Sequence, residues 1–227
     1  MVQVKTVAVI TGDVNASSKI PEKDARLLES LLKSCYQDSE KFLEKANLKA
    51  FTGFRGDSWQ FIVENPVMAV RATLLFRSLL LVKSDRKFEK KFHTSAAIGF
   101  GSINFLPNNK SLAGGGVAYE VSGKRLDKLR RRMPGMGASG LEKINQSLDS
   151  VLGLIDALVR QWTTLQAQAV SYALQGYSQI EISKRWTPPI SQQAAYKHLA
   201  SAGWPAIEPA LQWAETTIKD CILKNNL

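Results

Sequence analysis

Two short stretches in the first third of the sequence decide the fold. They are residues 7–18, VAVITGDVNASS, and residues 51–63, FTGFRGDSWQFIV. Each contains an apolar run bounded by an aspartate, Asp13 or Asp57, beside residues that favour turns. If the runs are neighbouring strands, the two carboxylates lie at one end of a sheet, where they can bind a hard cation and the phosphates that it carries. The alternative is that both aspartates only form turns.

The flanking sequence predicts the order β-α-β-β-α-β, followed by a further helix. The expected elements are a strand at 4–11, a helix at 22–46, a hairpin at 48–54 and 58–64, a helix from Asn65 to about 83, a strand at 94–103 and a helix at 115–131. This order is typical of the ferredoxin-like α+β fold, an antiparallel four-stranded sheet with helices on one face. In that topology the first strand lies beside the hairpin, so Asp13 and Asp57 are expected to be neighbours.

Residues 133–227 show a different sequence pattern. Residues 133–140, MPGMGASG, break the pattern and indicate a linker or flexible loop. A helix at 141–161 carries an apolar stripe, and three helices separated by tight turns follow it. We therefore expect a first domain at 1–135, a linker and connecting helix at 136–161, and a helix-turn-helix domain at 162–227.

Size and charge bound the function. The 227 residues and an apolar fraction of 44% are enough for a substantial core. The net charge of +10 is compatible with binding to polyphosphate or nucleic acid. However, residues 151–227 carry six Lys or Arg and five Asp or Glu, so the basic charge lies in residues 1–150, with clusters at 83–91 and 124–132. A charge run of this kind is also common on a solvated face.

Cysteine usage and hydropathy point to the cytoplasm. Cys35 and Cys221 fall in predicted helices far apart in the sequence, so we expect buried thiols rather than a disulfide. Two cysteines and two histidines without ligand spacing make a zinc site improbable. The sequence contains no membrane-length apolar stretch and no signal-type N-terminus, so we expect no membrane partner.

Residues 1–132 resemble the catalytic domain of class III nucleotidyl cyclases, in particular the cyclase-like proteins of the SatD family. Four segments carry the resemblance in the right order: ITGD at 10–13, GD at 56–57, AIGFG at 97–101, and GGGVA at 114–118 with Arg125 and Leu126. The resemblance implies that Asp13 and Asp57 bind Mg²⁺ or Mn²⁺ on a nucleotide. It also implies a phosphate-facing group made of Val14, Asn15, Ala16, Ser17 and Arg125. The chain departs from the family at Gly53, where a purine-selecting lysine is expected, and at Val121, where a transition-state asparagine is expected.

Residues 163–202 resemble the helix-turn-helix of sigma-factor region four and of related response regulators. The expected recognition helix offers side chains that can contact base edges or phosphates, namely Ser191, Gln192, Gln193, Tyr196, Lys197 and His198. Because this part of the chain is nearly neutral, a protein-interaction role is the alternative.

The combined interpretation favours a nucleotide-responsive, DNA-binding transcriptional regulator. The alternative is an active Mg²⁺- or Mn²⁺-dependent nucleotidyl cyclase or related nucleotidyltransferase. Because the resemblance implies pairing and the stripe on the helix at 141–161 needs cover, we expect a homodimer.

Overall fold

The computed structural model describes residues 5–15, 24–54, 56–106, 114–132 and 135–225. They form an α+β protein around a five-stranded sheet with the order β2-β3-β1-β4-β5. The strands are β1 (Val7–Val14), β2 (Leu48–Phe54), β3 (Ser58–Val63), β4 (Thr94–Gly101) and β5 (Met136–Ser139). The first four strands pair antiparallel, and β1 lies between β3 and β4. The predicted adjacency of β1 and the hairpin is therefore confirmed.

The sheet is wider than predicted. Residues 136–139, expected in a linker, form β5, which pairs in parallel with β4 from Ala96↔Met136 to Gly99↔Ser139. The strand is short and contains a glycine that the Arg125 side chain covers, since a Cβ on Gly137 would lie 2.5 Å from Arg125 Nε. The local sequence gives no strand signal here. The strand forms because its pairing with β4 supplies the stabilisation.

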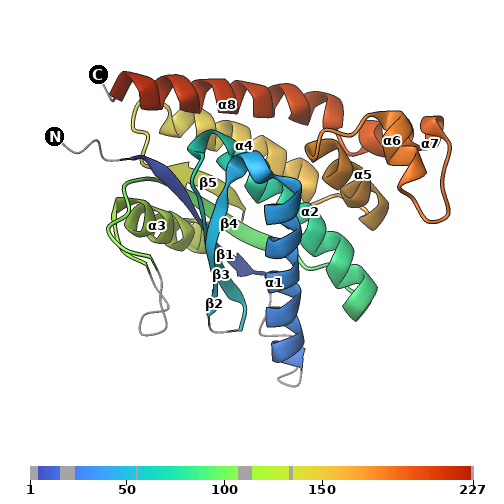
Figure 1. The fold of residues 1–227 in the computed structure, drawn as a ribbon, viewed down its shortest axis with the longest axis horizontal. Helices are drawn as coiled ribbons and strands as arrows, with labels where there is room; N and C mark the ends of the chain where they lie inside the picture. Colours follow the sequence, from blue (N-terminus) through green and yellow to red (C-terminus); the bar gives the residue numbers. More distant parts are fainter. Residues whose placement is uncertain (1–4, 16–23, 55, 107–113, 133–134, 226–227) are drawn as a thin grey trace.

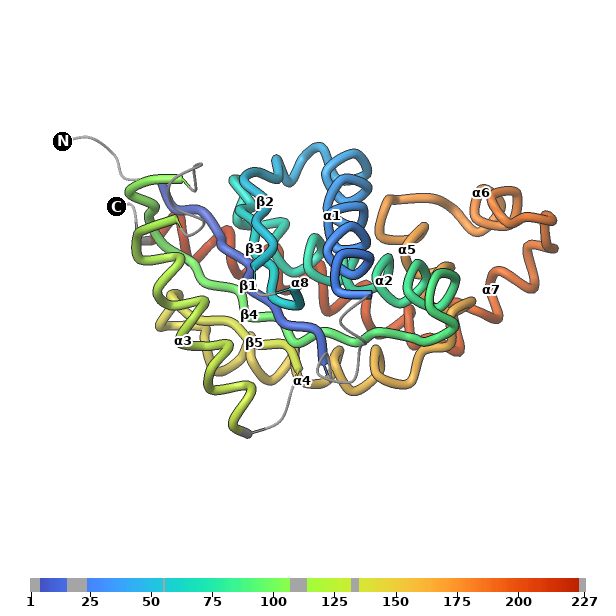
Figure 2. Tube along the Cα trace, turned by 90° about the horizontal axis from the view of Figure 1, so that it is seen from below, coloured from blue at the N-terminus to red at the C-terminus, as the bar shows by residue number. Residues whose placement is uncertain are grey.

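Helices cover both faces of the sheet, whereas the prediction placed them on one. Alternate residues of β1 point to opposite faces: Ala8 and Ile10 join the core under α1 (Ala25–Phe42) and α2 (Ala69–Phe88), while Val7 and Val9 pack against α3 (Val117–Arg132). Figure 2 shows α3 on one side of the strands and α1 and α2 on the other. Because α3 covers only part of its face, the β2 and β3 side remains open to a cavity.

The helix α4 (Asn145–Val159) is packed rather than free. Its apolar stripe, including Leu148 and Leu152, is buried in the same core cluster as the sheet and α2. The stripe therefore gives no support to a dimer, which corrects that part of the expectation. The same cluster continues to Cys221 near the end of the chain, so the core is continuous from the sheet into the C-terminal helices. The division into a first domain at 1–135, a connecting segment at 136–161 and a helix-turn-helix domain at 162–227 stays a prediction.

The C-terminal helices begin where capping residues predict. Thr163 and Ser178 form capping boxes at the starts of α5 (Thr164–Leu174) and α6 (Gln179–Lys184), and Ser191 caps α7 (Gln192–Ser201). The long α8 (Trp204–Asn225) then returns across the molecule toward α4 (Figure 1). Contacts between α2 and α5 include Arg86 Nη2 donating to Gln168 Oε1 at 2.8 Å.

Cys35 and Cys221 are confirmed as buried thiols that form no disulfide. Burial raises the pKa of the Cys35 thiol to about 12, so this group is unreactive at neutral pH. Among the described residues, none of the helices combines the length and the hydropathy that crossing a membrane requires.

Candidate functional site

Asp13 and Asp57 lie together at one end of the sheet. Asp13 is paired in register with Ser58, the first residue of β3, and Asp57 immediately precedes it. The Ser58 hydroxyl lies 2.9 Å from Asp13 Oδ1 and 3.4 Å from Asp57 Oδ1, within donating distance of both carboxylates. One hydroxyl proton can serve only one of them at a time, so the two carboxylates share this donor. The structure thus brings together the two residues that the sequence singled out.

The end of β1 is held firmly from the core side. Gly12 leaves room for the Trp59 ring, since a Cβ at this position would lie 2.1 Å from it. The Trp59 Nε1 donates to Thr94 Oγ1 at 3.0 Å, and the Thr94 hydroxyl lies 2.8 Å from the Asp13 carbonyl oxygen. This contact network positions the Asp13 backbone while its carboxylate faces the α3 side.

Arg130 is a site residue that the sequence analysis did not single out. Its Nη2 lies 2.8 Å from Asp13 Oδ1. Arg130 belongs to the basic cluster at 124–132, which we expected to face solvent or nucleic acid. Only the register of α3 on the sheet distinguishes it from its basic neighbours. Its guanidinium supplies positive charge beside the two carboxylates.

The described part of the predicted phosphate-facing backbone is already hydrogen-bonded within the protein. The Val14 N–H donates to the Asp57 carbonyl at 3.1 Å, and the Asn15 N–H donates to the His93 carbonyl at 2.8 Å. These two N–H groups are therefore already used, which argues against their predicted role as phosphate donors. Ala16 and Ser17 lie outside the described residues.

Arg125 points to another partner. Its Nη2 forms an ion pair of 2.8 Å with Asp149 Oδ2 on α4, and its guanidinium packs over Gly137. It is not among the described residues that line the cavity. Its predicted role toward a nucleotide therefore gains no support from the described geometry.

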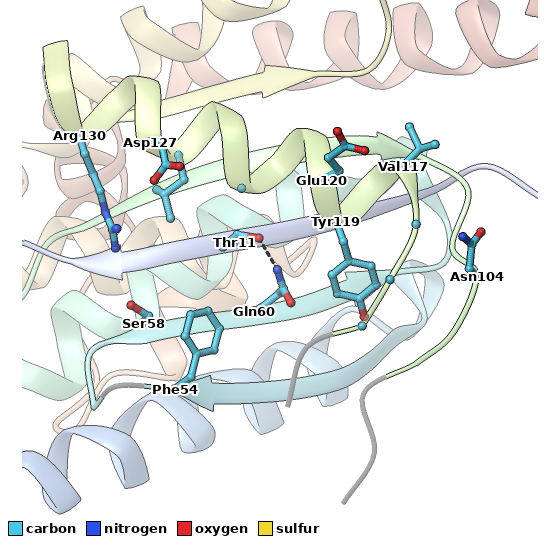
Figure 3. Close-up of a pocket in the computed structure, with 15 residues that line it drawn as sticks. Thr11, Phe54, Ser58, Gln60, Asn104, Val117, Tyr119, Glu120, Asp127 and Arg130 are labelled. Carbon is cyan, nitrogen blue, oxygen red and sulfur yellow. Dashed lines mark hydrogen bonds between the residues drawn. The ribbon is translucent and has the colours of Figure 1, made fainter. Parts of the chain in front are cut away.

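A cavity of about 800 Å³ opens between α3 and the uncovered part of the sheet. This volume is within the range of small-molecule sites. Ser58 and Arg130 lie at one end of it and Tyr119 and Asn104 at the other, with Thr11 and Gln60 between them (Figure 3). Asp13 and Asp57 are not among the described lining residues, but their carboxylates lie next to the Ser58 end, because the Ser58 hydroxyl contacts both.

The donor set fits Mg²⁺ or Mn²⁺ in one particular way. No group of three or more Asp, Glu, His or Cys side chains suited to a metal occurs within the described parts of the chain. Mg²⁺ is commonly bound by one or two carboxylates, with waters and substrate phosphates completing its shell. Asp13 and Asp57 can supply the two carboxylates, so the site fits a cation that arrives with a phosphate ligand.

The predicted recognition-helix residues lie on α7 and at its N-cap, far in sequence from the residues that line the cavity. Ser191 accepts a hydrogen bond from the Ala194 N–H at 3.1 Å and so serves as the helix cap. Gln192, Gln193, Tyr196 and Lys197 are exposed. By contrast, His198 stacks on Trp186 with ring centroids 5.5 Å apart. The structure therefore leaves four of the predicted side chains accessible without assigning them a partner.

Comparisons with known proteins assign neither a family nor an activity to this chain. No family model matches the sequence. No curated protein matches it either. Solved structures of similar fold include a bacterial light-regulated adenylyl cyclase, with 18% identity and a TM-score of 0.43 over 64% of this chain and 81% of that chain. Others are the guanylyl cyclase Cya2, with 10% identity and a TM-score of 0.39 over 52% and 68%, and the catalytic core of a rhodopsin-guanylyl cyclase with converted specificity, with 13% identity and a TM-score of 0.41 over 60% and 78%. At these levels the similarity assigns neither substrate nor reaction to this chain.

Proposed function

We propose that the protein binds a nucleoside triphosphate with Mg²⁺ or Mn²⁺ at Asp13 and Asp57 and acts as a nucleotidyl cyclase or related nucleotidyltransferase. One observation carries the proposal: both carboxylates lie within reach of the Ser58 hydroxyl at the end of a nucleotide-sized cavity. Carboxylate pairs at such an edge suit a cation that is shared with phosphate oxygens.

The cation, when bound, would neutralise charge on the phosphates during transfer. The residues of the chain have distinct parts in this scheme. Asp13 and Asp57 would hold the cation, and Ser58 would orient their oxygens. Arg130, a planar donor suited to bidentate phosphate contacts, balances the charge of Asp13 and is near enough to the cavity to contact a phosphate instead.

The placement of the cavity favours an enzyme over the regulator that the sequence analysis preferred. The cavity lies on the α3 face, whereas α5 packs on α2, which covers the opposite face. A ligand-controlled switch needs contacts that differ between two states of the protein. The helices after residue 162 instead share one continuous core with the sheet. Catalysis at the cavity requires no signal across the sheet.

We expect the full chain to convert at least one of the four common nucleoside triphosphates into a cyclic or otherwise transferred nucleotide in the presence of Mn²⁺. Mass spectrometry of the products is the measurement, with chelated metal as the control. Binding of a triphosphate without any product would leave the site as a sensor and favour the regulator.

The regulator is the second candidate, because α7 exposes Gln192, Gln193, Tyr196 and Lys197 from a helix capped by Ser191. Glutamine side chains can contact adenine edges, and lysine can contact phosphates. In this scheme the nucleotide and its cation are the signal, and duplex DNA or a protein is the partner.

For this candidate we expect duplex binding that weakens steeply with salt and that falls at least about tenfold in Gln192→Ala with Lys197→Ala, because a base contact and a phosphate contact are removed together. Fluorescence anisotropy at two salt concentrations measures it. The exposed lysine pair Lys219→Ala with Lys224→Ala on α8 is the matched control. Equal affinity of wild type and the α7 variant would exclude a recognition role for α7.

The homodimer remains part of the proposal on different grounds from the α4 stripe. Phe105, Leu106 and Val117 are each about half exposed, and Phe105 is bridged to Gly115, a cavity-lining residue. Large exposed apolar side chains beside a cavity are typical of an interaction surface. A cytoplasmic location also remains a proposal, consistent with two thiols that form no disulfide.

A further inference from the structure

A chain of three hydrogen bonds crosses the floor of the cavity. Gln60 Nε2 donates to Thr11 Oγ1 at 2.6 Å, Thr11 Oγ1 and Ser122 Oγ are 2.8 Å apart, and Ser122 Oγ donates to the Tyr119 carbonyl at 2.9 Å. All four residues are buried. The chain connects β3 and β1 to α3.

The last member sets the direction of the whole chain. A backbone carbonyl can only accept, so Ser122 donates to it and must accept from Thr11. Thr11 has then used its proton and must accept from Gln60, which fixes the amide nitrogen of Gln60 toward Thr11. The reverse orientation of the Gln60 amide would make only two of the three bonds. Buried polar networks favour the fully satisfied arrangement.

This direction leaves the amide oxygen of Gln60 facing the cavity. Figure 3 shows that oxygen turned away from Thr11, on the side toward Tyr119. Gln60 lies two residues along β3 from Ser58, about 7 Å at the usual strand rise. This spacing leaves about the length of a ribose between Ser58 and the Gln60 side chain, and the acceptor lies beyond it on the side toward Tyr119.

A second observation at this end of the cavity also indicates a polar ligand. Tyr119 extends from α3 toward the sheet, is 8% exposed, and its hydroxyl has no hydrogen-bond partner within the described part of the chain. Burial raises the pKa of this phenol to about 12, so it stays protonated and able to donate at neutral pH. The Phe54 ring lines the cavity beside Ser58, its register partner, and offers an apolar face there (Figure 3).

We propose that Gln60 selects the base of the bound nucleotide, its amide oxygen accepting a hydrogen bond from an exocyclic amino group, so that adenine or cytosine is preferred over the matching oxo bases. The inference rests on the proposed function, because it takes the phosphates to lie at Asp13 and Asp57. An oxo base would place a second acceptor against the Gln60 oxygen and leave both unpaired. Sites built to hydrogen-bond a group discriminate strongly against analogues without it.

The test uses two pairs of triphosphates, adenine against hypoxanthine and cytosine against uracil, in which the exocyclic amino group becomes an oxo group and the adjacent ring nitrogen gains a proton. The 3′-deoxy forms prevent cyclisation during calorimetry with Mn²⁺. For wild type we expect the amino member of at least one pair to bind at least about tenfold more tightly. In Gln60→Leu the two members should bind within about threefold of each other.

Ser122→Ala tests the direction of the chain without touching the ligand, since Ser122 is fully buried and is not among the described residues that line the cavity. It removes the anchor, so the amide of Gln60 can turn, and the preference should fall at least about threefold. Ser78→Ala is the matched control: Ser78 is also fully buried on a helix and donates to a backbone carbonyl, that of Leu74, at 2.8 Å. It should leave the preference unchanged.

The outcomes separate the two proposals. Metal-dependent binding with no amino preference, or a preference that survives in Gln60→Leu, would overturn this inference and leave the proposed function intact. Absence of metal-dependent binding for every triphosphate would overturn both. Thermal unfolding of each variant checks that a lost preference does not reflect a lost fold.

Discussion

Asp57→Asn is expected to weaken Mn²⁺-dependent triphosphate binding by about 100-fold or more and to bring product formation below detection. The substitution keeps the size of the side chain and removes its charge. Even partners outside the first coordination shell commonly account for 10- to 100-fold of metal affinity, so a direct ligand should account for at least the upper end. Calorimetry with and without Mn²⁺ measures the binding, and mass spectrometry measures the product.

Asp127→Asn is the matched control for this result. Asp127 is an aspartate that lines the cavity itself, but no contact joins it to Ser58 in the described structure. It should change Mn²⁺-dependent binding by less than about threefold. If Asp57→Asn and Asp127→Asn behave alike, the carboxylate pair is not the cation site, and the two aspartates only close turns.

Asp156→Asn is expected to have the largest effect on stability, about 3–5 kcal/mol of unfolding free energy. Arg77 on α2 and Asp156 on α4 are 3% and 7% exposed at their side chains, and Arg77 Nη2 lies 2.7 Å from Asp156 Oδ1. Both charged groups are buried, so solvent screens their coulombic attraction only weakly. Burial lowers the pKa of Arg77, and the Asp156 charge opposes that shift. Without the carboxylate, the guanidinium is left buried and uncompensated.

The measurement is thermal or denaturant unfolding at neutral pH, and the expected fall in Tm is about 6–20 °C for a chain of this size. Asp38→Asn is the control, because Asp38 forms an ion pair of the same length, 2.7 Å, with Lys83, but at a partly exposed position. Exposed pairs contribute about 0–1 kcal/mol, so its Tm should fall by no more than a few degrees. Similar losses in both variants would show that burial does not set the strength of the Arg77–Asp156 pair.

The sequence was sufficient for the parts of the site that depend on short-range pattern. Apolar runs that stop at Asp13 and Asp57, with a hairpin between 48 and 64, determine that the two aspartates meet, because β3 must pair with β1 in this topology. Capping residues likewise located α5, α6 and α7 to within a few residues.

The remaining parts depend on register and on distant contacts. Arg130 is one of several basic residues on α3, and only the docking angle of the helix brings it to Asp13. The strand β5 forms because β4 offers an edge, and its four residues, Met136 to Ser139, carry no periodic signal. The chain from Gln60 to Ser122 joins residues 62 positions apart in sequence, whose proximity is visible only once α3 is placed on the sheet.

The helix α2 connects the sheet and the C-terminal helices into one packed core. Side chains on every side of it are buried, including Thr73 and Ser78, whose hydroxyls return to their own helix backbone. A helix that is buried on all sides needs cover on all sides, and here the sheet and α1 supply one half while α5 and α8 supply the other. Truncating the chain after the sheet would therefore expose a large apolar surface and promote aggregation. Any assay of the cavity has to be performed on the intact polypeptide, because the C-terminal helices cover the core that supports the sheet beneath the cavity.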